Sequence, residues 1–383
     1  MEKKMKYLQT DLYHNFNCIG GECEESCCAA DWNIIIDNET YQKYESMDDT
    51  TKHWIYKNIE ICEDGSYKIN MDSNGRCPFL NENNLCNIIL KTSEDYISQV
   101  CQTYPRKITQ YNDIEFYTVS TSCPEAARLL VERDTPIKFY TGENEKKYKE
   151  GKNLELFQAL LNGYETSVEI LQNNKLSLSE KYVYLLLLVE EIHAVIEKKE
   201  FDKISLILEK FKSEKNRKAM IKNVDNIFSM KLNQWTTVSL LLNILLASEI
   251  EEKEWLYSNV VEALKTFNGS TYNIWKDKYK KIEIIQEKEN LAVQFIFEYF
   301  MDALNNKSLY KSLAKMYVML TYIEIFEVLF YKKKGKLSAE DRIKIITEVS
   351  RIMEHTVILD CICDEFMEEN PTLNLIRLLN CIL

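Results

Sequence analysis

Eight cysteines in the first third of the chain have a spacing that is typical of metal ligands. The segment CIGGECEESCC places four of them within eleven residues, and the other four occur in CPFLNENNLC, CQTYPR and SCPEAARL. A soft metal needs several thiolates at about 2.3 Å, and loops that contain proline or glycine can bend tightly enough to provide them. The pattern therefore predicts a zinc or iron–sulfur site formed by Cys18, Cys23, Cys27, Cys28, Cys77, Cys86, Cys101 and Cys123.

Disulfide bonds are a less favoured use of these thiols. A chain of 383 residues can bury a large core without covalent cross-links. The N-terminal segment MEKKMKYLQTDLYHNF has no apolar run of signal-peptide length, so we expect a cytoplasmic protein. Clustered thiols in a reducing compartment are more often metal ligands than bridges. Four further cysteines lack such contexts and are left out of the site: Cys62, Cys361, Cys363 and Cys381.

The charge and the apolar runs exclude two classes of function. A net charge of −12 argues against a nucleic-acid binder, which needs a basic face, and it permits a cationic substrate, although many soluble proteins are equally acidic. The apolar run at 182–189 is too short to span a membrane. The run at 316–331 carries Glu324 and Glu327 on one helical face. We therefore expect neither nucleic-acid binding nor membrane insertion.

The elements that must position the cysteines differ between the two halves of the chain. Residues 1–134 combine candidate strands at 33–37, 66–71 and 114–120 with short helices and turn signals, and this part contains the eight thiols. We predict a mainly α protein, in which a small cysteine-rich α+β metal-binding region is followed by an all-helical domain. The predicted domains are 1–134 and 154–383, joined by a linker at 135–153.

The second half has helical periodicity throughout. Glycine and proline nearly vanish after residue 152, and apolar residues recur every three or four positions. Ser338 stands three residues before Asp341, which is the spacing of a capping box at a helix start. Helices are predicted at 152–173, 178–198, 200–212, 214–231, 234–248, 252–267, 274–303, 305–333, 338–355 and 357–383.

The cysteine motifs resemble those of the flagellin lysine-N-methylase family. The resemblance rests on CIGGECEESCCAADWNIIID, CPFLNENNLCNI, CQTYPRKI and SCPEAARLL, and it covers about the first 130 residues. The same motifs are similar to those of zinc- or iron-chelating cysteine-cluster proteins. The resemblance implies methyl transfer from S-adenosylmethionine to lysine side chains of flagellin, with a bound [4Fe-4S] cluster. It leaves open which four of the eight cysteines bind the cluster, and whether the others form a second site.

Four residues near the cysteines are candidates for the chemistry that this resemblance implies. Methylation needs a neutral lysine amine, so the site must desolvate the side chain and accept its proton. Tyr104, Arg106, Glu125 and Arg128 lie within a few residues of Cys101 or Cys123. They could contact the cofactor or the lysine, or they could be ordinary packing residues and a surface ion pair.

Two questions stay open at this point. The chain has no glycine-rich nucleotide-binding turn, so the sequence assigns no residues to S-adenosylmethionine. The alternative to an enzyme is a non-catalytic adaptor, in which zinc or iron stabilises the N-terminal fold and the helical domain binds a protein partner.

Overall fold

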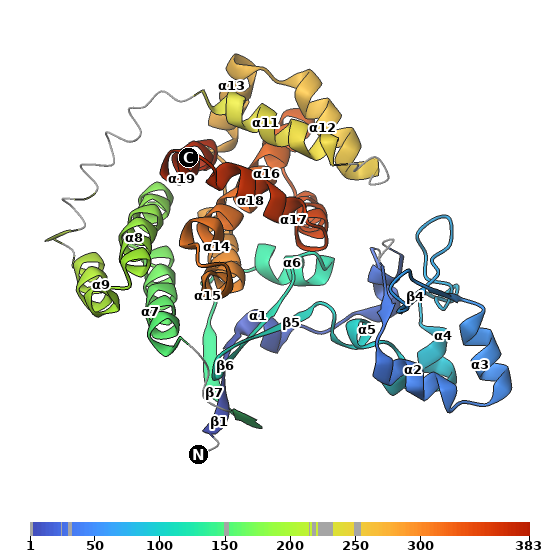
Figure 1. Cartoon of the computed structure of the whole chain (residues 1–383). Coiled ribbons are helices and arrows are strands. Elements are labelled where there is room, and N and C mark those ends of the chain that lie inside the picture. Colours follow the sequence, from blue (N-terminus) through green and yellow to red (C-terminus); the bar gives the residue numbers. More distant parts are fainter. Residues whose placement is uncertain are drawn as a thin grey trace.

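The computed structural model is mainly helical, and the strands among its described residues lie in the N-terminal part of the chain (Figure 1). It describes residues 3–23, 25–29, 33–148, 153–213, 215–216, 220, 233–248 and 254–383. The predicted mainly α class is confirmed, and so are the three predicted strands. The helix predicted at 214–231 falls largely outside the described residues.

A four-stranded sheet joins the two ends of the N-terminal region. Its order is β5-β6-β1-β7, formed by β1 (Lys3–Thr10), β5 (Arg106–Tyr111), β6 (Ile114–Val119) and β7 (Phe139–Tyr148). β1 is parallel to β6 and antiparallel to β7. The segment predicted to be a linker therefore contains a paired strand. Its sequence, FYTGENEKKY, is polar, and it becomes a strand because its backbone pairs with β1.

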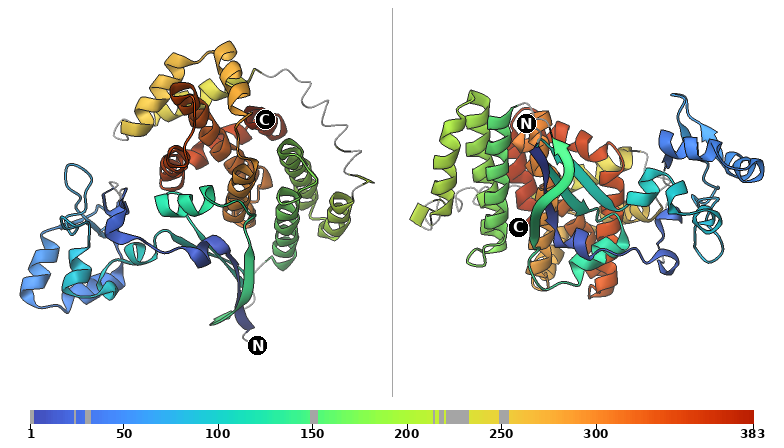
Figure 2. Two further views of the ribbon diagram at one scale, coloured as in Figure 1. Left: turned by 180° about the vertical axis from the view of Figure 1, so that it is seen from behind. Right: turned by 90° about the horizontal axis from the view of Figure 1, so that it is seen from below.

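A separate small body lies to one side of the helices in both views of Figure 2. It contains a three-stranded sheet of β2 (Ile35–Ile36), β4 (Tyr67–Ile69) and β3 (Ile59–Ile61), with α2 (Asn38–Glu45), α3 (Asp49–Tyr56), α4 (Asn87–Lys91) and α5 (Gln99–Thr103). Its own buried cluster runs from Ile34 to Ile97. Leu12, Phe116 and Val119, in contrast, belong to the large core that the helices share. The division into domains at 134 and 154 stays a prediction.

The remaining helices surround the large core. They are α1 (Asp11–Asn15), α6 (Pro124–Val131), α7 (Leu154–Leu171), α8 (Leu178–Lys198), α9 (Ile204–Lys212), α11 (Gln234–Ala247), α12 (Glu254–Thr266), α13 (Gly269–Tyr279), α14 (Ile285–Tyr299), α15 (Ala303–Asn306), α16 (Leu309–Lys334), α17 (Ala339–Glu354), α18 (Ile358–Met367) and α19 (Pro371–Ile382). The predicted capping box of Ser338 and Asp341 is confirmed at the start of α17.

Two predicted helices are each divided in two. The segment 274–303 contains the turn between α13 and α14, where Lys280 donates to Glu283 and Glu324 and so holds the chain in a bend. The segment 357–383 is interrupted before Pro371, because proline lacks an N–H and disfavours a helical residue before it. Asn370 caps the new helix by accepting from the Leu373 amide at 3.0 Å.

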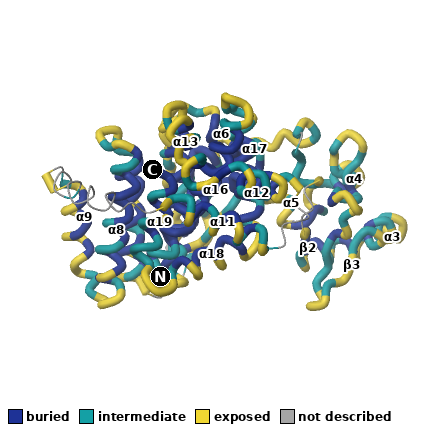
Figure 3. The backbone as a smooth tube through the Cα atoms, turned by 90° about the horizontal axis from the view of Figure 1, so that it is seen from above, coloured by how far each residue is buried: buried dark blue, intermediate teal, exposed yellow. Residues whose placement is uncertain are grey.

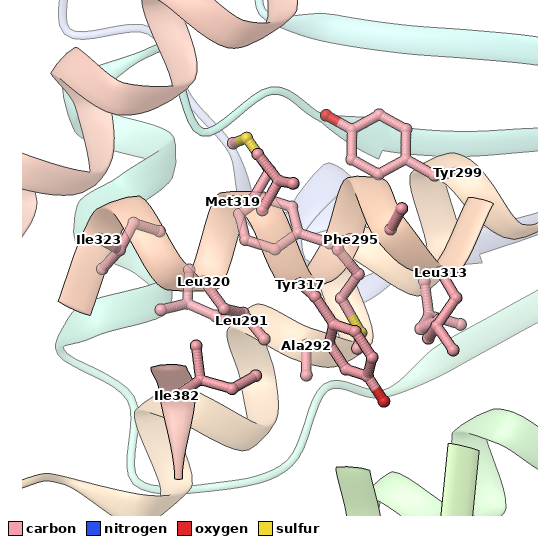
Figure 4. Close-up of a cluster of buried hydrophobic side chains, with 14 of the residues drawn as sticks. Leu291, Ala292, Phe295, Tyr299, Leu313, Tyr317, Met319, Leu320, Ile323 and Ile382 are labelled. Atoms are coloured by element: carbon pink, nitrogen blue, oxygen red, sulfur yellow. The ribbon is translucent and has the colours of Figure 1, made fainter. Parts of the chain in front are cut away.

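Helix α16 forms the centre of the molecule and is buried over nearly all of its length (Figure 3). Tyr317, Leu320 and Ile323 of α16 pack against Leu291 and Phe295 of α14, as Figure 4 shows. A helix that is apolar on all sides needs neighbours all round it. The helices α13, α14, α17 and α19 supply them.

Two carboxylates of this central helix are paired inside the core. Glu327 is fully buried, forms an ion pair with Lys288 of α14 and accepts from the Tyr279 hydroxyl at 2.6 Å. Glu324 is 3% exposed and accepts from Lys280 at 2.6 Å. No described helix is long and apolar enough to cross a membrane.

The buried pair of Lys288 and Glu327 gives a stability prediction. Removing one partner of a buried ion pair leaves the other charge uncompensated, so Glu327→Gln is expected to lower the free energy of unfolding by about 3–5 kcal/mol. Urea denaturation measures the change. Glu200→Gln is the control, because its pair with Lys203 lies at the surface and should leave stability nearly unchanged. Equal stabilities of the two variants would contradict the prediction.

Candidate functional site

All eight predicted cysteines line one cavity of about 240 Å³. The cavity lies between residues 16–23 and 25–28, the small body and the start of α6. Its other walls are mostly apolar and include Phe16, Tyr44, Phe79, Leu80 and Ile97. Cysteines more than a hundred residues apart in sequence are therefore brought to a single site with mostly apolar walls. None of the four cysteines left out of the prediction lines this cavity.

Local structure explains how several thiols are presented. Cys27 and Cys28 begin a short 3-10 helix, and their thiols are hydrogen-bonded to each other. Cys86 and Cys123 are the N-cap residues of α4 and α6. Backbone N–H groups of Glu125 and Ala126 act on Cys123 to lower its pKa, against the larger effect of burial. Such N–H groups favour a thiolate.

The thiols fall into two sets of four. One set is Cys28, Cys77, Cys86 and Cys101, and the other is Cys18, Cys23, Cys27 and Cys123. Cys77, Cys86 and Cys101 pack against the small core, and the Cys77 amide donates to the carbonyl of Cys28 at 2.8 Å. Burial raises the pKa of Cys77 to about 12 and that of Cys101 to about 11, and Cys28 and Cys86 contribute to both shifts. Cys123 instead belongs to the large core. Burial raises its pKa to about 11, and Cys23 and Cys18 add to this.

Cys27 and Cys28 connect the two sets. A hydrogen bond between their thiols raises the pKa of Cys27 and lowers that of Cys28. Cys18 and Cys123 also raise the pKa of Cys27, whereas Cys28 raises the pKa values of Cys77, Cys86 and Cys101. Among the described residues, no group of three or more metal-binding side chains is close enough to hold a single ion as it stands. The thiols therefore line the wall of the cavity without converging on one point.

The four predicted catalytic residues have different positions relative to this cavity. Tyr104 and Glu125 line it. Arg128 lies in an adjoining pocket and pairs with Glu125 at 3.5 Å. Arg106 is not among the lining residues; its guanidinium donates to the Phe16 carbonyl at 3.1 Å and lies over the Phe16 ring. The catalytic roles of all four stay predictions.

A hydrogen-bonded chain of residues, which the sequence analysis missed, leads away from the cavity. Tyr104 and Ser122 share a hydrogen bond of 3.2 Å between their hydroxyls, and Ser122 contacts Nε2 of His355 at 2.8 Å. Ser122 also bonds Ser120, which donates to Glu354 at 2.7 Å. Glu354 and His355 lie more than 230 residues from Ser120 and Ser122. No spacing pattern in the sequence could have connected them.

Tyr104 and His355 of this network are neutral near pH 7. Burial raises the pKa of Tyr104, so its hydroxyl stays protonated. Burial, with Lys107 and Arg351 nearby, lowers the pKa of His355 to about 4. Burial next to Glu298 raises the pKa of Glu354 to about 8, although Lys107 opposes the shift. Among Tyr104, His355 and Glu354, Glu354 is therefore the group whose protonation changes closest to neutral pH.

Glu354, at the far end of this hydrogen-bonded network, lines a second pocket. This pocket, of about 260 Å³, is bounded by β5, α14 and α17, and by Asp302 and Asp360. Lys107 and Glu298 form an ion pair of 2.9 Å in its wall. The cysteine cavity is thus connected, through Ser122 and Ser120, to a polar pocket that contains several carboxylates.

The raised pKa of Glu354 predicts a pH dependence of stability. A carboxyl whose pKa is higher in the folded state stabilises that state fully below its ordinary value of 4.5. This contribution is lost as the pH rises through about 8. Glu354→Gln is expected to flatten the decline in unfolding free energy between pH 5 and 8, as measured by urea denaturation. An unchanged slope would show that Glu354 ionises normally.

Comparisons with known proteins agree with these motifs. The family model "FliB lysine N-methylase C-terminal domain" matches residues 164–380, in the helical part of the chain. The Lysine-N-methylase of Salmonella typhimurium is 29% identical over 138 residues, which are 34% of this chain and 34% of that protein. The flagellar biosynthetic protein FliU of Salmonella muenchen is 30% identical over 138 residues, which are 34% of this chain and 81% of that protein. No solved structure matches.

The family match and the motif resemblance lie in different parts of the chain. The match with the first of these relatives spans about a third of that protein's length. The family model, in contrast, covers more than half of this chain, and it lies in helices that the sequence analysis could describe only by their periodicity. It confirms the resemblance that the cysteine motifs indicated, and the chain belongs to the FliB lysine N-methylase family.

Proposed function

We propose that the protein is an S-adenosylmethionine-dependent protein-lysine N-methyltransferase that acts on flagellin in the bacterial cytoplasm. Family membership carries the proposal, together with the similarity of this chain to proteins named lysine-N-methylase and to a flagellar biosynthetic protein. The arrangement of the site supports it. A cysteine-lined cavity lies at one end of a hydrogen-bonded chain whose other end is a carboxyl that titrates near neutral pH.

The cysteine cavity suits an iron–sulfur cluster better than a zinc ion. Four thiolates on one zinc ion must converge on a point, whereas those around a four-iron cluster bind separate iron atoms and stand farther apart. The thiols here line a cavity of about 240 Å³ and do not converge. We assign the cluster to Cys28, Cys77, Cys86 and Cys101, because the last three pack against the small core and the Cys77 amide donates to the Cys28 carbonyl. When bound, a cluster would join their loops and could polarise the methyl donor.

The residues of the chain itself would manage the proton. In methyl transfer the lysine nitrogen attacks the methyl carbon, the carbon–sulfur bond breaks, and S-adenosylhomocysteine leaves. The ammonium group must lose a proton before this attack. Glu354 suits that step, because a base is most effective when its pKa lies near the working pH. Tyr104, which lines the cavity, would take the proton from the lysine as it gives its own to Ser122, and Ser122 and Ser120 would pass it on to Glu354.

The metal assignment predicts that the protein is coloured and that replacing the cluster ligands removes the colour. Protein prepared without oxygen should be brown, with broad absorption near about 400 nm that is typical of cysteine-ligated clusters. Serine at both Cys77 and Cys101 should remove the absorption and destabilise the small body, because metal binding is coupled to folding. The control is Cys361→Ser, since Cys361 is exposed and does not line the cavity. Colourless wild-type protein with stoichiometric zinc would contradict the assignment.

The proton step predicts a turnover defect with an intact cluster. Glu354→Gln should slow single-turnover methylation of flagellin by labelled S-adenosylmethionine about 100-fold or more, while absorbance and flagellin binding stay unchanged. Glu200→Gln at the surface should behave as wild type. Wild-type rates in Glu354→Gln would exclude this residue as the base. A cluster-loaded wild-type protein that binds flagellin without methylating it would instead favour the adaptor alternative.

A further inference from the structure

The pocket that contains Arg128 adjoins the cysteine cavity and has a volume of about 410 Å³. It lies between α6, α17 and the segment that carries Cys23. The two cavities share part of their walls, and the residues that line both are Ile19, Cys23, Glu25, Pro124 and Glu125. This pocket is large enough for a nucleoside-sized molecule, which would then lie next to the thiols.

The pocket combines charges of both signs with an apolar wall. Its lining includes four carboxylates and two cationic side chains, Arg128 and Lys344. Both cations are about 40% exposed and can be reached from solvent. Ile19, Pro124 and Ile343 provide apolar surface. A ligand that suits this lining has a flat apolar ring, a carboxylate and an excess of positive charge.

One lining side chain has a hydrogen-bonding group without a partner. Thr347 of α17 is fully buried, and its hydroxyl has no hydrogen-bond partner among the described residues. Buried hydroxyl groups are nearly always paired, because an unpaired one costs about 1–3 kcal/mol. A bound molecule in this pocket would supply the missing partner.

The charge pattern favours one class of ligand over two others. A divalent cation is disfavoured, because Glu25 is already paired with Lys344 at 2.9 Å and Arg351 at 3.4 Å. A phosphate-rich ligand is disfavoured, because carboxylates outnumber cations in the lining. S-adenosylmethionine carries a sulfonium, an ammonium and one carboxylate, and its net positive charge complements this pocket.

We propose that the pocket between α6 and α17 binds the methyl donor, with Lys344 turning from Glu25 to the carboxylate of its amino-acid part and Thr347 as a hydrogen-bond partner. The proposal rests on the proposed methyltransferase function and names the place of its cofactor. The donor would reach the cysteine cavity through the shared wall at Cys23 and Glu125.

The test measures binding of the product S-adenosylhomocysteine to the full-length protein by isothermal titration calorimetry. Lys344→Met should weaken this binding about tenfold and leave binding of 5′-methylthioadenosine unchanged, because the latter compound lacks the amino-acid part. Thr347→Val should weaken S-adenosylhomocysteine binding by about five- to tenfold, and Thr347→Ser should restore it. Lys336→Met is the matched control, since Lys336 is exposed and lies outside the pocket.

The possible outcomes separate this inference from the proposed function. Wild-type affinity in both Lys344→Met and Thr347→Val, with methylation of flagellin intact, would overturn the placement and leave the function standing. A wild-type protein that binds neither S-adenosylhomocysteine nor S-adenosylmethionine would overturn both. If Thr347→Val does not fold, the exposed Lys344→Met variant decides alone, through its differential effect on the two ligands.

Discussion

The pairing of buried carboxylates on α16 with lysines from neighbouring helices is the constraint on which the helical part depends. A charge in a core is tolerated only with a partner, so Glu327 requires Lys288 and Glu324 requires Lys280. These lysines belong to α14 and to the turn after α13. Their pairing therefore fixes the positions of both helices against α16. Lys276 of α13 also donates a hydrogen bond of 2.7 Å to the Cys381 carbonyl, which holds α19 against α13.

Hydrogen bonds and an ion pair connect helix α14 to the sheet, and through the sheet to the site. Gln294 donates to the Val119 carbonyl at 2.9 Å and to Glu298 at 2.7 Å, and Glu298 pairs with Lys107 of β5. The strand end at Val119 is followed directly by Ser120, Thr121, Ser122 and Cys123, all of which are buried. This short segment connects the large core to the cysteine cavity. The position of Cys123 is thus set by helices that are distant in sequence.

The same segment explains why thiols and carboxyls lie so close together. Thr121 shares a hydrogen bond of 2.7 Å with Ser350, and Arg351 donates to the Ser122 carbonyl at 3.2 Å. Arg351 and Lys344 also hold Glu25 of the cysteine-rich segment. One face of α17 therefore orders both the loop before α6 and the segment of Cys23. A cofactor pocket at this junction would respond to changes in either part.

The sequence by itself determined the class of the fold, the eight thiols of the cavity and the family. Apolar periodicity fixes a helix wherever no tertiary contact opposes it, and clustered cysteines with nearby prolines indicate a shared site. Only the tertiary structure decided that α13 and α14 are separate, that β7 pairs with β1, and that Glu354 and His355 join Ser122. These features depend on contacts between residues far apart in the chain. Spacing within a sequence carries no information about such contacts, because burial and pairing arise only when the helices pack.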